Sequence, residues 1–443
     1  MSQKPLPAFL KINLDGNLSI GPIELKELAA KFGTPLYVLD EETIRDNLNQ
    51  YKIGFLAAGL KNAQVAYAGK ALLNLSMAAL VAQENCFLDV VSQGELHTAL
   101  KAGFPLARVI FHGNNKSQEE LTAALDLKIG RIVVDNAYEF FLLKKLISDR
   151  KETIDILFRV TPGVEAETHE YIKTAQYDSK FGIGLTDPLL WQLVQEAIEE
   201  PKINLLGLHC HIGSQIMQFE PYELSLNLIL DFYQQIEQKF DHILPELNIG
   251  GGLGIRYSAK DKPLDKKEFA QKLAQTYIDT CQARAMAPPK LFIEPGRSIV
   301  AEAGLTLYQV GSIKHLPGIR TYLSVDGGMS DNIRPALYDA EYEVWAVEKA
   351  LEPLSFQARI VGKHCETGDV LIKEAQLPQM EPGDILAVLA TGAYNYSMAS
   401  NYNRLAKPAM VMVREGVAHL VQKRESLDDL ISHDVLPEHL KID

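Results

Sequence analysis

The chain has 443 residues, which is long for one ordinary compact unit, so we expect two domains, one of them large. Hydrophobic residues make up 47% and charged residues 23%, which is typical of a globular protein with a substantial core. The net charge of -13 argues against nucleic acid or an anionic membrane as the main partner, and no apolar run reaches transmembrane length or resembles a secretory signal.

Between about residues 63 and 296, short β-branched or apolar runs alternate with segments of helical periodicity. Eight such runs predict strands, at 63–69, 86–92, 108–113, 131–136, 154–160, 203–213, 246–252 and 290–296. Helix-like stretches lie between them, for example 72–83, 118–127, 137–149 and 188–200. Eight strands alternating with helices over roughly 230–250 residues favour an α/β fold of the (β/α)8 TIM-barrel type. A doubly wound open sheet is the competing architecture, but fewer strands are expected for it.

Polar residues and glycines gather where these predicted strands end. The group comprises Lys70, Ser92, His112, Asp135, Arg159, His211, Gly250 to Gly252 and Glu294. Barrel enzymes carry their active sites at the carboxyl ends of the strands, so this clustering predicts a site at that end.

The pattern changes after residue 300, where strand-like segments are divided by turns and long helical patterns are missing. The opening residues 10–40 also read as short strands around one helix, and they could join the same domain in space. We therefore expect a barrel at 41–300 and a mainly β domain, a β-barrel or sandwich, formed by 1–40 and 301–443.

The four cysteines, Cys86, Cys210, Cys281 and Cys365, are widely separated and form no CxxC pair. This usage predicts a reduced, cytoplasmic protein rather than a disulfide framework.

The segment YAGKALLN places Lys70 just past the end of the first predicted strand. A lysine in such a position is usually a solvated charge. A desolvated lysine can instead lose its proton and condense with an aldehyde, which makes Lys70 a candidate attachment point for an aldehyde cofactor.

The segment HCHIGSQ holds two histidines, His209 and His211, that alternate along a strand and therefore share one face. A metal would suit that spacing, but a convincing set of further ligands is missing, so we predict no metal site. We expect His209 to be a hydrogen-bonded core residue, while His211 could lie flat against an aromatic ring. Gly213 and Ser214 could donate hydrogen bonds to an anion.

Two further segments end the seventh and eighth strands. The glycines of NIGGGLGI allow close backbone approach to a phosphate, although tight turns also use such runs. EPGRSIV sets Glu294 near Arg297, which could be a simple ion pair at the barrel rim. Together, the four segments offer an amine, a stacking ring, a phosphate cradle and an acid. These are the groups that pyridoxal phosphate (PLP) requires, because a carboxylate beside the pyridine nitrogen keeps that nitrogen protonated.

With these motifs the chain resembles the diaminopimelate decarboxylases, within the alanine-racemase-like barrel family of PLP enzymes. The resemblance also includes RVTPGVEAETHEYIKTAQYDSKFGIG from Arg159, SVDGGMSDNIRPALYDA from Ser324, GKHCETGDVL from Gly362 and TGAYNYSMASNYN from Thr391. It covers nearly the whole chain, and the order of the motifs makes it specific.

The resemblance implies a set of cofactor-binding residues. Lys70 would carry PLP covalently, His211 would stack on its ring, and Glu294 would pair with the pyridine nitrogen. The residues implied around the phosphate are Ser214, Gly251, Gly252, Gly296 and Arg297. The residues implied elsewhere in the cofactor pocket are Asp89, Arg159 and Tyr394.

The resemblance also implies a substrate site and a homodimer. Arg297, Arg334 and Tyr338 would hold the distal carboxylate of an amino-acid substrate, and Tyr394 would contact both cofactor and substrate. Cys365 would come from a second subunit to protonate the substrate carbon, and Glu366 would bind the distal ammonium, so that the β domain contributes to both the active site and the dimer interface.

The implied reaction removes the carboxylate at the D-configured centre of meso-diaminopimelate and yields L-lysine and carbon dioxide. Alternatives are a decarboxylase of the same fold acting on ornithine, arginine or carboxynorspermidine, and a racemase, which would not explain the EPGR and CETGD motifs. A catalytically inactive binding protein would be expected to have lost Lys70 or Cys365, and both are present.

Overall fold

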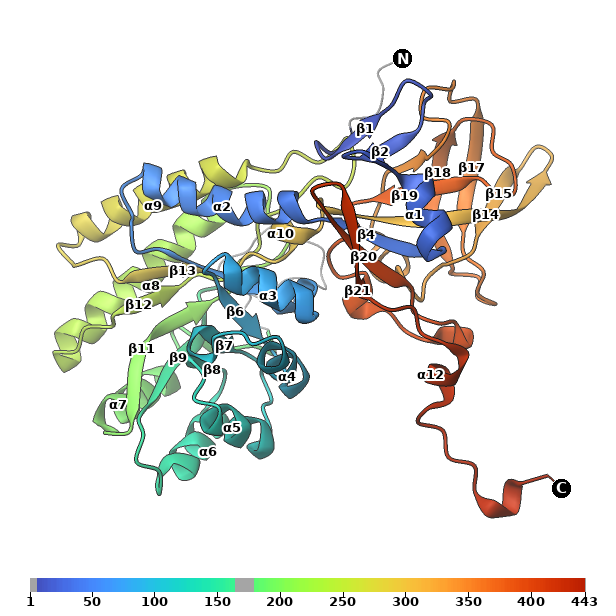
Figure 1. The fold of residues 1–443 in the computed structure, drawn as a ribbon. Helices are drawn as coiled ribbons and strands as arrows, with labels where there is room; N and C mark the ends of the chain where they lie inside the picture. Colours follow the sequence, from blue (N-terminus) through green and yellow to red (C-terminus); the bar gives the residue numbers. More distant parts are fainter. Residues whose placement is uncertain (1–5, 164–178, 443) are drawn as a thin grey trace. The chain divides into compact units, whose positions relative to one another are not determined.

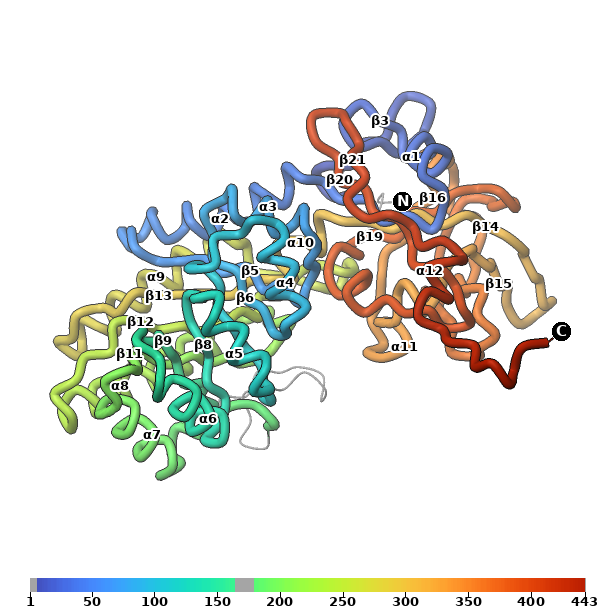
Figure 2. Tube along the Cα trace, turned by 60° about the horizontal axis from the view of Figure 1, so that its bottom comes forward, coloured from blue at the N-terminus to red at the C-terminus, as the bar shows by residue number. Residues whose placement is uncertain are grey.

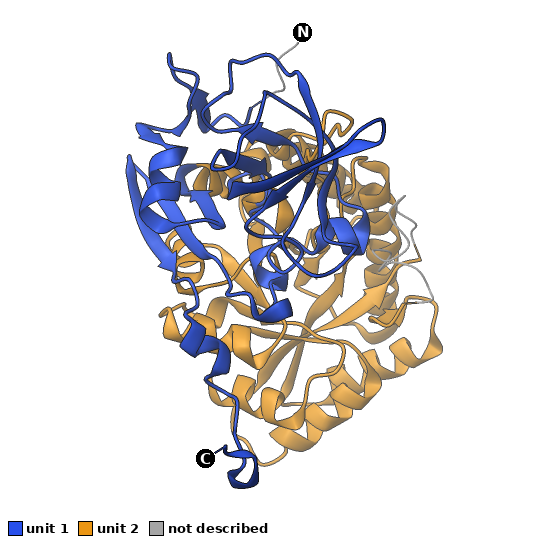
Figure 3. Cartoon of the chain, turned by 90° about the vertical axis from the view of Figure 1, so that its right-hand side faces the viewer, with its two compact units in different colours: residues 1–42, 301–443 blue, residues 43–300 orange. Residues whose placement is uncertain are grey.

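The computed structural model of the chain describes residues 6–163 and 179–442. It divides into two compact units (Figure 3), one formed by residues 1–42 and 301–443 and the other by residues 43–300. We call the first the β unit and the second the barrel unit, and we describe each by itself.

The barrel unit is built on a closed ring of eight parallel strands. These are β5 (Gln64–Ala68), β6 (Phe87–Val90), β7 (Val109–Phe111), β8 (Arg131–Val134), β9 (Ile154–Thr161), β11 (Ile203–Cys210), β12 (Glu246–Asn248) and β13 (Lys290–Ile293). Each strand pairs with the next, and β13 pairs with β5 to close the ring. The predicted (β/α)8 architecture and its eight strands are confirmed. A short ninth strand, β10 (Ile183–Gly184), pairs with β9 and was not predicted, because two residues carry no periodicity.

Helices lie outside the strands of the barrel unit (Figures 1 and 2). They are α2 (Glu41–Ala57), α3 (Leu75–Gln83), α4 (Gln93–Lys101), α5 (Gln118–Asp126), α6 (Ala137–Ile147), α7 (Pro188–Glu199), α8 (Glu220–Phe240), α9 (Lys266–Ala283) and the short α10 (Arg297–Val300). Several begin at a side-chain cap, such as the capping box of Ser117 and Glu120 on α5. These caps fix where each strand-to-helix loop ends and so hold the loops at the carboxyl ends of the strands.

Side chains inside the ring stack in layers, because alternate residues of a strand point to the same face. The middle layer is apolar and comprises Ala66, Phe87, Ile110, Val133, Leu157 and Phe292. Arg131, two residues before Val133, forms a buried ion pair with Glu246 at 2.5 Å. The guanidinium of Arg131 lies over the rings of Phe87 and Phe292, at 5.1 and 5.0 Å. The middle and lower layers thus fill the barrel, and the upper layer is left to form a site.

The β unit contains two sheets. The smaller has β1 (Leu10–Ile12), β2 (Leu18–Ile20) and β3 (Ile23–Glu24), which lead into α1 (Leu25–Phe32). The larger follows the order β18 (Val370–Leu377), β17 (Phe356–Val361), β15 (Arg320–Val325), β14 (Gly304–Leu316), β4 (Leu36–Asp40), β20 (Ala409–Arg414) and β21 (Val417–Gln422). β19 (Ile385–Leu389) pairs with β14 and with β16 (Val344–Ala346). The N-terminal strand β4 therefore lies between strands from the last third of the chain.

Alternating side chains of these strands form one core in the β unit. It includes Leu36, Val38, Leu305, Leu307, Ala387, Leu389, Val411 and Val413. Short helices α11 (Arg334–Tyr338) and α12 (Leu427–Ile431) lie in the connections. Among the described residues, none of the helices combines the length and apolar character needed to cross a bilayer.

Candidate active site

A polar layer lies at the carboxyl ends of the barrel strands, and five of its seven members lie two residues beyond a residue of the apolar layer. Its members are Asp89, His112, Asp135, Arg159, His209, Asn248 and Glu294, all at most 9% exposed. Because the side-chain period of a strand is two, they point into the barrel like the apolar residues that precede them. Strand pairing sets several of them side by side, since His209 is the register partner of both Arg159 and Asn248.

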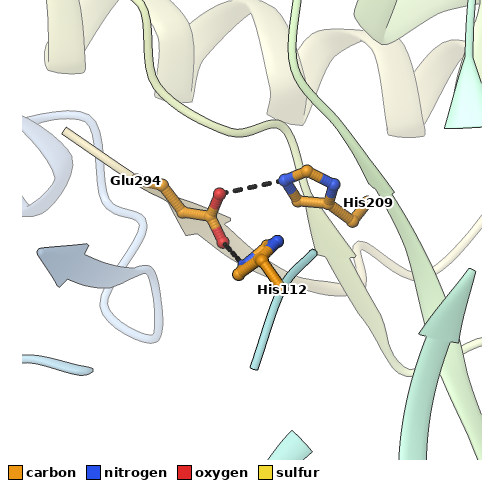
Figure 4. A group of neighbouring side chains, drawn as sticks. All are labelled: His112, His209 and Glu294. Carbon is orange, nitrogen blue, oxygen red and sulfur yellow. Dashed lines mark hydrogen bonds and ion pairs between the residues drawn. The ribbon is translucent and has the colours of Figure 1, made fainter. Parts of the chain in front are cut away.

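Glu294 is the centre of this layer (Figure 4). One carboxylate oxygen, Oε1, accepts hydrogen bonds from His112 Nε2 at 2.9 Å and Asn248 Nδ2 at 2.6 Å. The other, Oε2, accepts from His209 Nε2 at 2.9 Å. The three donors come from β12 and from the ends of β7 and β11, so only the closed barrel brings them together.

These neighbours keep Glu294 ionised. Burial alone would raise the pKa of Glu294, but His112 and His209 outweigh it and hold the pKa well below its usual range. Burial lowers the pKa of His112, yet Asp89 and Glu294 more than offset this, and the net shift is upward. Burial dominates at His209 and lowers its pKa to about 4, so this imidazole is neutral and donates through Nε2. The layer therefore holds a carboxylate beside His209, which is neutral, and His112, whose charged form Asp89 and Glu294 favour.

The sequence predicted no metal site, and the pair considered there was His209 and His211, whereas the structure groups His209 with His112 and Glu294. In the structure the ligand-type atoms of His112, His209 and Glu294 lie within 4.8 Å of one another. Both Nε2 atoms, however, are within hydrogen-bond distance of the carboxylate oxygens, which fits donors to a carboxylate better than ligands of a metal ion.

Asp89 and Arg159 line the same end of the barrel. Asp89 Oδ1 lies 3.8 Å from His112 Nε2, and burial raises the pKa of this carboxyl while His112 opposes the rise. Arg159 Nε lies 3.8 Å from Asp135 Oδ1, and its guanidinium stands over the Phe181 ring at 4.3 Å. Residues 164–178, the middle of the motif that starts at Arg159, lie outside the described part of the chain.

Lys70 follows β5 directly, in the single turn Gly69–Ala71, and is exposed. Burial raises the pKa of Asp89 and lowers that of His211, and the charge of Lys70 opposes the first shift and adds to the second. The lysine therefore stands at the same end of the barrel as the polar layer.

The loops after β11 and β12 lie against each other. The backbone N–H of Gly251 donates to His211 Nδ1 at 3.4 Å, and Ile216 N donates to Gly252 O at 2.9 Å. Gly252 has φ +112, and a Cβ there would lie 2.5 Å from Gly213 O, so only glycine fits. Burial lowers the pKa of the half-buried His211 well below its usual range, which keeps the ring neutral.

Arg297 begins α10, directly after Gly296, and joins these loops. Its Nη2 donates to Ser214 Oγ at 2.9 Å, and its Nη1 donates to the Tyr257 hydroxyl at 2.5 Å. The side chain is buried. A guanidinium, a hydroxyl and glycine backbone thus converge beside the polar layer, the combination that suits a phosphate. Tyr257 was not singled out from the sequence.

The β unit brings together three of the predicted substrate residues. The guanidinium of Arg334 lies over the rings of Tyr338 and Tyr394, at 5.3 and 5.6 Å. Its Nε donates to the Tyr342 hydroxyl at 3.0 Å. Two acids close to Arg334 in the sequence make contacts of their own. Asp339 pairs with Lys373 at 2.8 Å. The Asp331 carboxylate accepts from the Tyr308 hydroxyl and from Gly328 N. Arg334 is therefore a buried cation surrounded by phenol rings.

Cys365 and Glu366 lie on the connection between β17 and β18, and both are exposed. Glu366 Oε1 accepts from Gly368 N at 3.2 Å, within the same connection. These two residues and the Arg334 cluster belong to the β unit, whereas Lys70 and Glu294 belong to the barrel unit.

Three partners of Glu294 were not predicted as site residues. His112 was noted only as a polar residue at a strand end, His209 was expected in the core, and Asn248 only opened the glycine motif. The signal that finds two of them is alternation, because His112 lies two residues after Ile110 of the apolar layer and Asn248 lies two residues after Glu246 of the buried ion pair. His209 is indeed buried and hydrogen bonded, but its partner is the site carboxylate.

Comparison with known proteins agrees with this geometry. Residues 42–301 match the family described as "Pyridoxal-dependent decarboxylase, pyridoxal binding domain". The diaminopimelate decarboxylase of Bacillus subtilis is 48% identical over 423 residues, which is 96% of this chain and 96% of that protein.

Solved structures give the same picture. A crystal structure of diaminopimelate decarboxylase from M. jannaschii in complex with L-lysine has a TM-score of 0.92 at 34% identity and covers 99% of this chain and 100% of its own. A lysine/ornithine decarboxylase from Vibrio vulnificus with putrescine has a TM-score of 0.75, covering 88% of this chain and 97% of its own, but at 21% identity it shares the fold alone.

Proposed function

The chain belongs to the pyridoxal-dependent decarboxylase family, and within it to the diaminopimelate decarboxylases, and we propose that it converts meso-diaminopimelate to L-lysine and carbon dioxide with PLP as cofactor. The observation that carries the proposal is Glu294, a buried carboxylate that two imidazoles and an amide keep ionised at the same barrel end as Lys70. The full-length identity to diaminopimelate decarboxylases decides the substrate.

The residues at this barrel end fit PLP. An ionised carboxylate in a buried layer is the partner that a protonated pyridine nitrogen needs. Beside it, the loops that hold Gly213 and Gly252 are so close that no Cβ fits, and Arg297 bonds to Ser214 at their edge. The neutral ring of His211 is oriented by the hydrogen bond at Nδ1, and we assign this ring to stack on the cofactor. Lys70, Glu294, His211 and the loop around Gly252 would therefore hold the cofactor.

PLP, when bound, supplies the electron sink for the electron pair left by the departing carboxylate. The chain's own residues supply charge and position. Three hydrogen-bond donors keep Glu294 ionised. Its carboxylate would therefore stabilise a proton on the pyridine nitrogen of bound PLP. Asp89 and Arg159 add further charges at the same end of the barrel, and we assign them to the cofactor pocket.

The residues for the second amino-acid head of the substrate remain those named by the resemblance. That head carries a carboxylate and an ammonium, so it requires cations and an acid. Arg297, Arg334 and Glu366 provide these charges, and Tyr338 and Tyr394 flank Arg334 with phenol groups. Ornithine and arginine end in a cation alone, so they offer no distal carboxylate to these arginines.

We propose a homodimer in which Cys365 and Glu366 serve the site of the partner subunit, the cysteine as proton donor to the substrate carbon. Both residues are exposed in the single chain, as residues that act on another subunit must be. A protein that depends on an exposed thiol needs a reducing compartment, which supports a cytoplasmic location.

Two measurements test the function. Purified protein assayed for carbon dioxide release from a panel of amino acids should act on meso-diaminopimelate and barely on lysine, ornithine or arginine. Borohydride reduction should fix the cofactor to the peptide that contains Lys70. Preferred turnover of ornithine, or label on another lysine with Lys70→Ala still active, would overturn the proposal.

A further inference from the structure

Cys365 lies on a turn of residues 362–369, here called the Cys365 turn, in which His364 and Asp369 are buried and residues 365–368 are exposed. His364 precedes the cysteine and Asp369 closes the turn, and their side chains are 0% and 2% exposed. His364 Nδ1 lies 2.8 Å from Asp369 Oδ2. The exposed tip, with Cys365 and Glu366, is thus held between the two members of a buried acid–imidazole pair.

The carboxylate of Asp369 accepts hydrogen bonds from the backbone of the turn and from the backbone of a second segment. Oδ2 also accepts from the backbone N–H of His364 at 2.9 Å, and Oδ1 accepts from Met329 N at 2.7 Å. The backbone N–H of Lys363 donates to Gly327 O at 3.0 Å. The carboxylate therefore ties the turn to the SVDGGMSD segment, a motif that the proposed chemistry has not used.

The fit against that segment is tight. A Cβ on Gly328 would lie 2.6 Å from both carboxylate oxygens of Asp369 and from His364 Nδ1. A Cβ on Gly362 would lie 2.2 Å from Asp369 Oδ2. Gly328 is also fixed by Asp331, whose carboxylate accepts from Gly328 N at 2.9 Å and from the Tyr308 hydroxyl.

The SNYN segment holds the turn from another side. Asn403 Oδ1 accepts from the backbone N–H of Cys365 at 3.0 Å. The Tyr402 ring is stacked on the His364 ring, with centroids 5.7 Å apart and planes 5° apart. Two distant segments of the β unit therefore converge on this one turn.

We propose that the His364–Asp369 pair positions the Cys365 turn, so that the thiol and the Glu366 carboxylate are presented in one fixed geometry. The pair does not touch substrate. It acts through Cys365 and Glu366, so the inference rests on the function proposed for them. Proton transfer requires the donor within hydrogen-bond reach of the carbon, and a shift of about 1 Å can lower a rate about 100-fold.

Matched substitutions separate the hydrogen bond from the bulk of the ring. His364→Asn keeps a donor near the place of Nδ1, whereas His364→Leu keeps volume without a donor. We expect His364→Leu to lower kcat by about tenfold or more and His364→Asn to recover most of that loss. Asp369→Asn replaces one accepting oxygen with an NH2 group, which cannot accept a hydrogen bond from His364 or Met329. This variant should also lower kcat by about tenfold or more. Lys363→Ala, exposed on the same turn, is the control and should change kcat less than about threefold.

A double-mutant cycle with Cys365→Ala, measured on holoenzyme with diaminopimelate, is the decisive experiment. If the pair acts through the thiol, Asp369→Asn should cost much less kcat in the Cys365→Ala background than in wild type, and its remaining effect should be on KM through Glu366. PLP content and the urea midpoint of His364→Asn should match wild type.

The outcomes are distinguishable. Unchanged kcat in Cys365→Ala overturns the proton-donor assignment, and the positioning inference with it. A large loss in Cys365→Ala with additive or silent effects at His364 and Asp369 overturns the positioning inference alone.

Discussion

Replacing Glu294 with glutamine should nearly abolish decarboxylation while the barrel stays folded. Glutamine keeps the size of the side chain and one carbonyl oxygen. That oxygen can stay on the side of His112 and Asn248, which both donate to it at 2.9 and 2.6 Å. The amide NH2 then faces His209 Nε2, so His209 has to carry its proton on Nδ1 instead.

The expected cost in stability is limited by this change of tautomer. His209 Nδ1 is buried and has no hydrogen-bond partner within residues 6–163 and 179–442. A proton at Nδ1 leaves one buried N–H unsatisfied, which costs about 1–3 kcal/mol. Removing the buried charge of Glu294 offsets part of this cost. The free energy of unfolding of Glu294→Gln should therefore fall by at most about 3 kcal/mol.

The expected cost in activity is larger. Glutamine cannot hold a proton on a pyridine nitrogen as a carboxylate does. Truncating one partner of a buried charge pair costs about 2–5 kcal/mol, which is roughly a 30- to 5,000-fold loss of kcat/KM at 1.36 kcal/mol per decade.

The assay compares carbon dioxide release from meso-diaminopimelate, PLP content and urea unfolding for three proteins. These are wild type, Glu294→Gln and the matched control Glu246→Gln, which changes another buried carboxylate at the opposite end of the barrel interior. The control should lose stability but keep kcat/KM within about threefold. Glu294→Gln with full PLP content and kcat/KM within threefold of wild type would refute the role given to this carboxylate.

The same variant predicts a pH dependence of stability. Burial raises the pKa of Glu294, but His112 and His209 hold it well below its usual range. A carboxylate with a lowered folded pKa stabilises the protein above its unfolded pKa of roughly 4.3, and that stability is lost as pH falls through the folded pKa. The difference in unfolding free energy between wild type and Glu294→Gln should therefore shift in favour of the variant as pH falls below about 4.3. If the difference in unfolding free energy did not change with pH, the carboxyl of Glu294 would have the same pKa in the folded and the unfolded protein.

Three further predictions concern the substrate, the assembly and the fold. Arg334→Ala should lower kcat/KM for meso-diaminopimelate by roughly thirty-fold or more without changing the cofactor spectrum, and unchanged turnover would remove this arginine from the substrate site. Mixing Lys70→Ala subunits with Cys365→Ala subunits, which keep only a small residual activity, should restore about a quarter of wild-type activity, because random pairing makes half of the dimers mixed, each with one intact site; no recovery despite proven exchange would mean that one chain builds the whole site. Glu246→Ala should lower the free energy of unfolding by about 3–5 kcal/mol, because Arg131 is left as a buried charge between two phenyl rings, and a loss under 1 kcal/mol by urea unfolding would contradict that account.

The sequence by itself determined the barrel and the residue types at its active end. Strand and helix periods are local, and polar groups such as Lys70 and Glu294 stand directly after apolar runs, so both could be read without knowing the fold. The placement of Arg297 near the glycine loops came from the family resemblance and not from the periodicity.

Only the tertiary structure decided how Glu294 is held. His112 lies 182 positions away along the chain, and His209 and Asn248 lie on other strands, so their meeting depends on the register of the closed ring. No local pattern records that register. Glu294 read alone suggested an ion pair with Arg297, whereas the carboxylate bonds to imidazoles and an amide.

The β unit shows the same division between sequence and fold. Strands were expected both before residue 40 and after residue 300, but the sequence did not show that β4 pairs with both β14 and β20. The Cys365 turn likewise depends on Gly328 and Asn403, which the sequence places in separate motifs. Strand pairing and buried hydrogen bonds join residues far apart in the chain, and a one-residue change of register would turn every side chain to the other face, so these contacts are fixed only when the whole sheet forms.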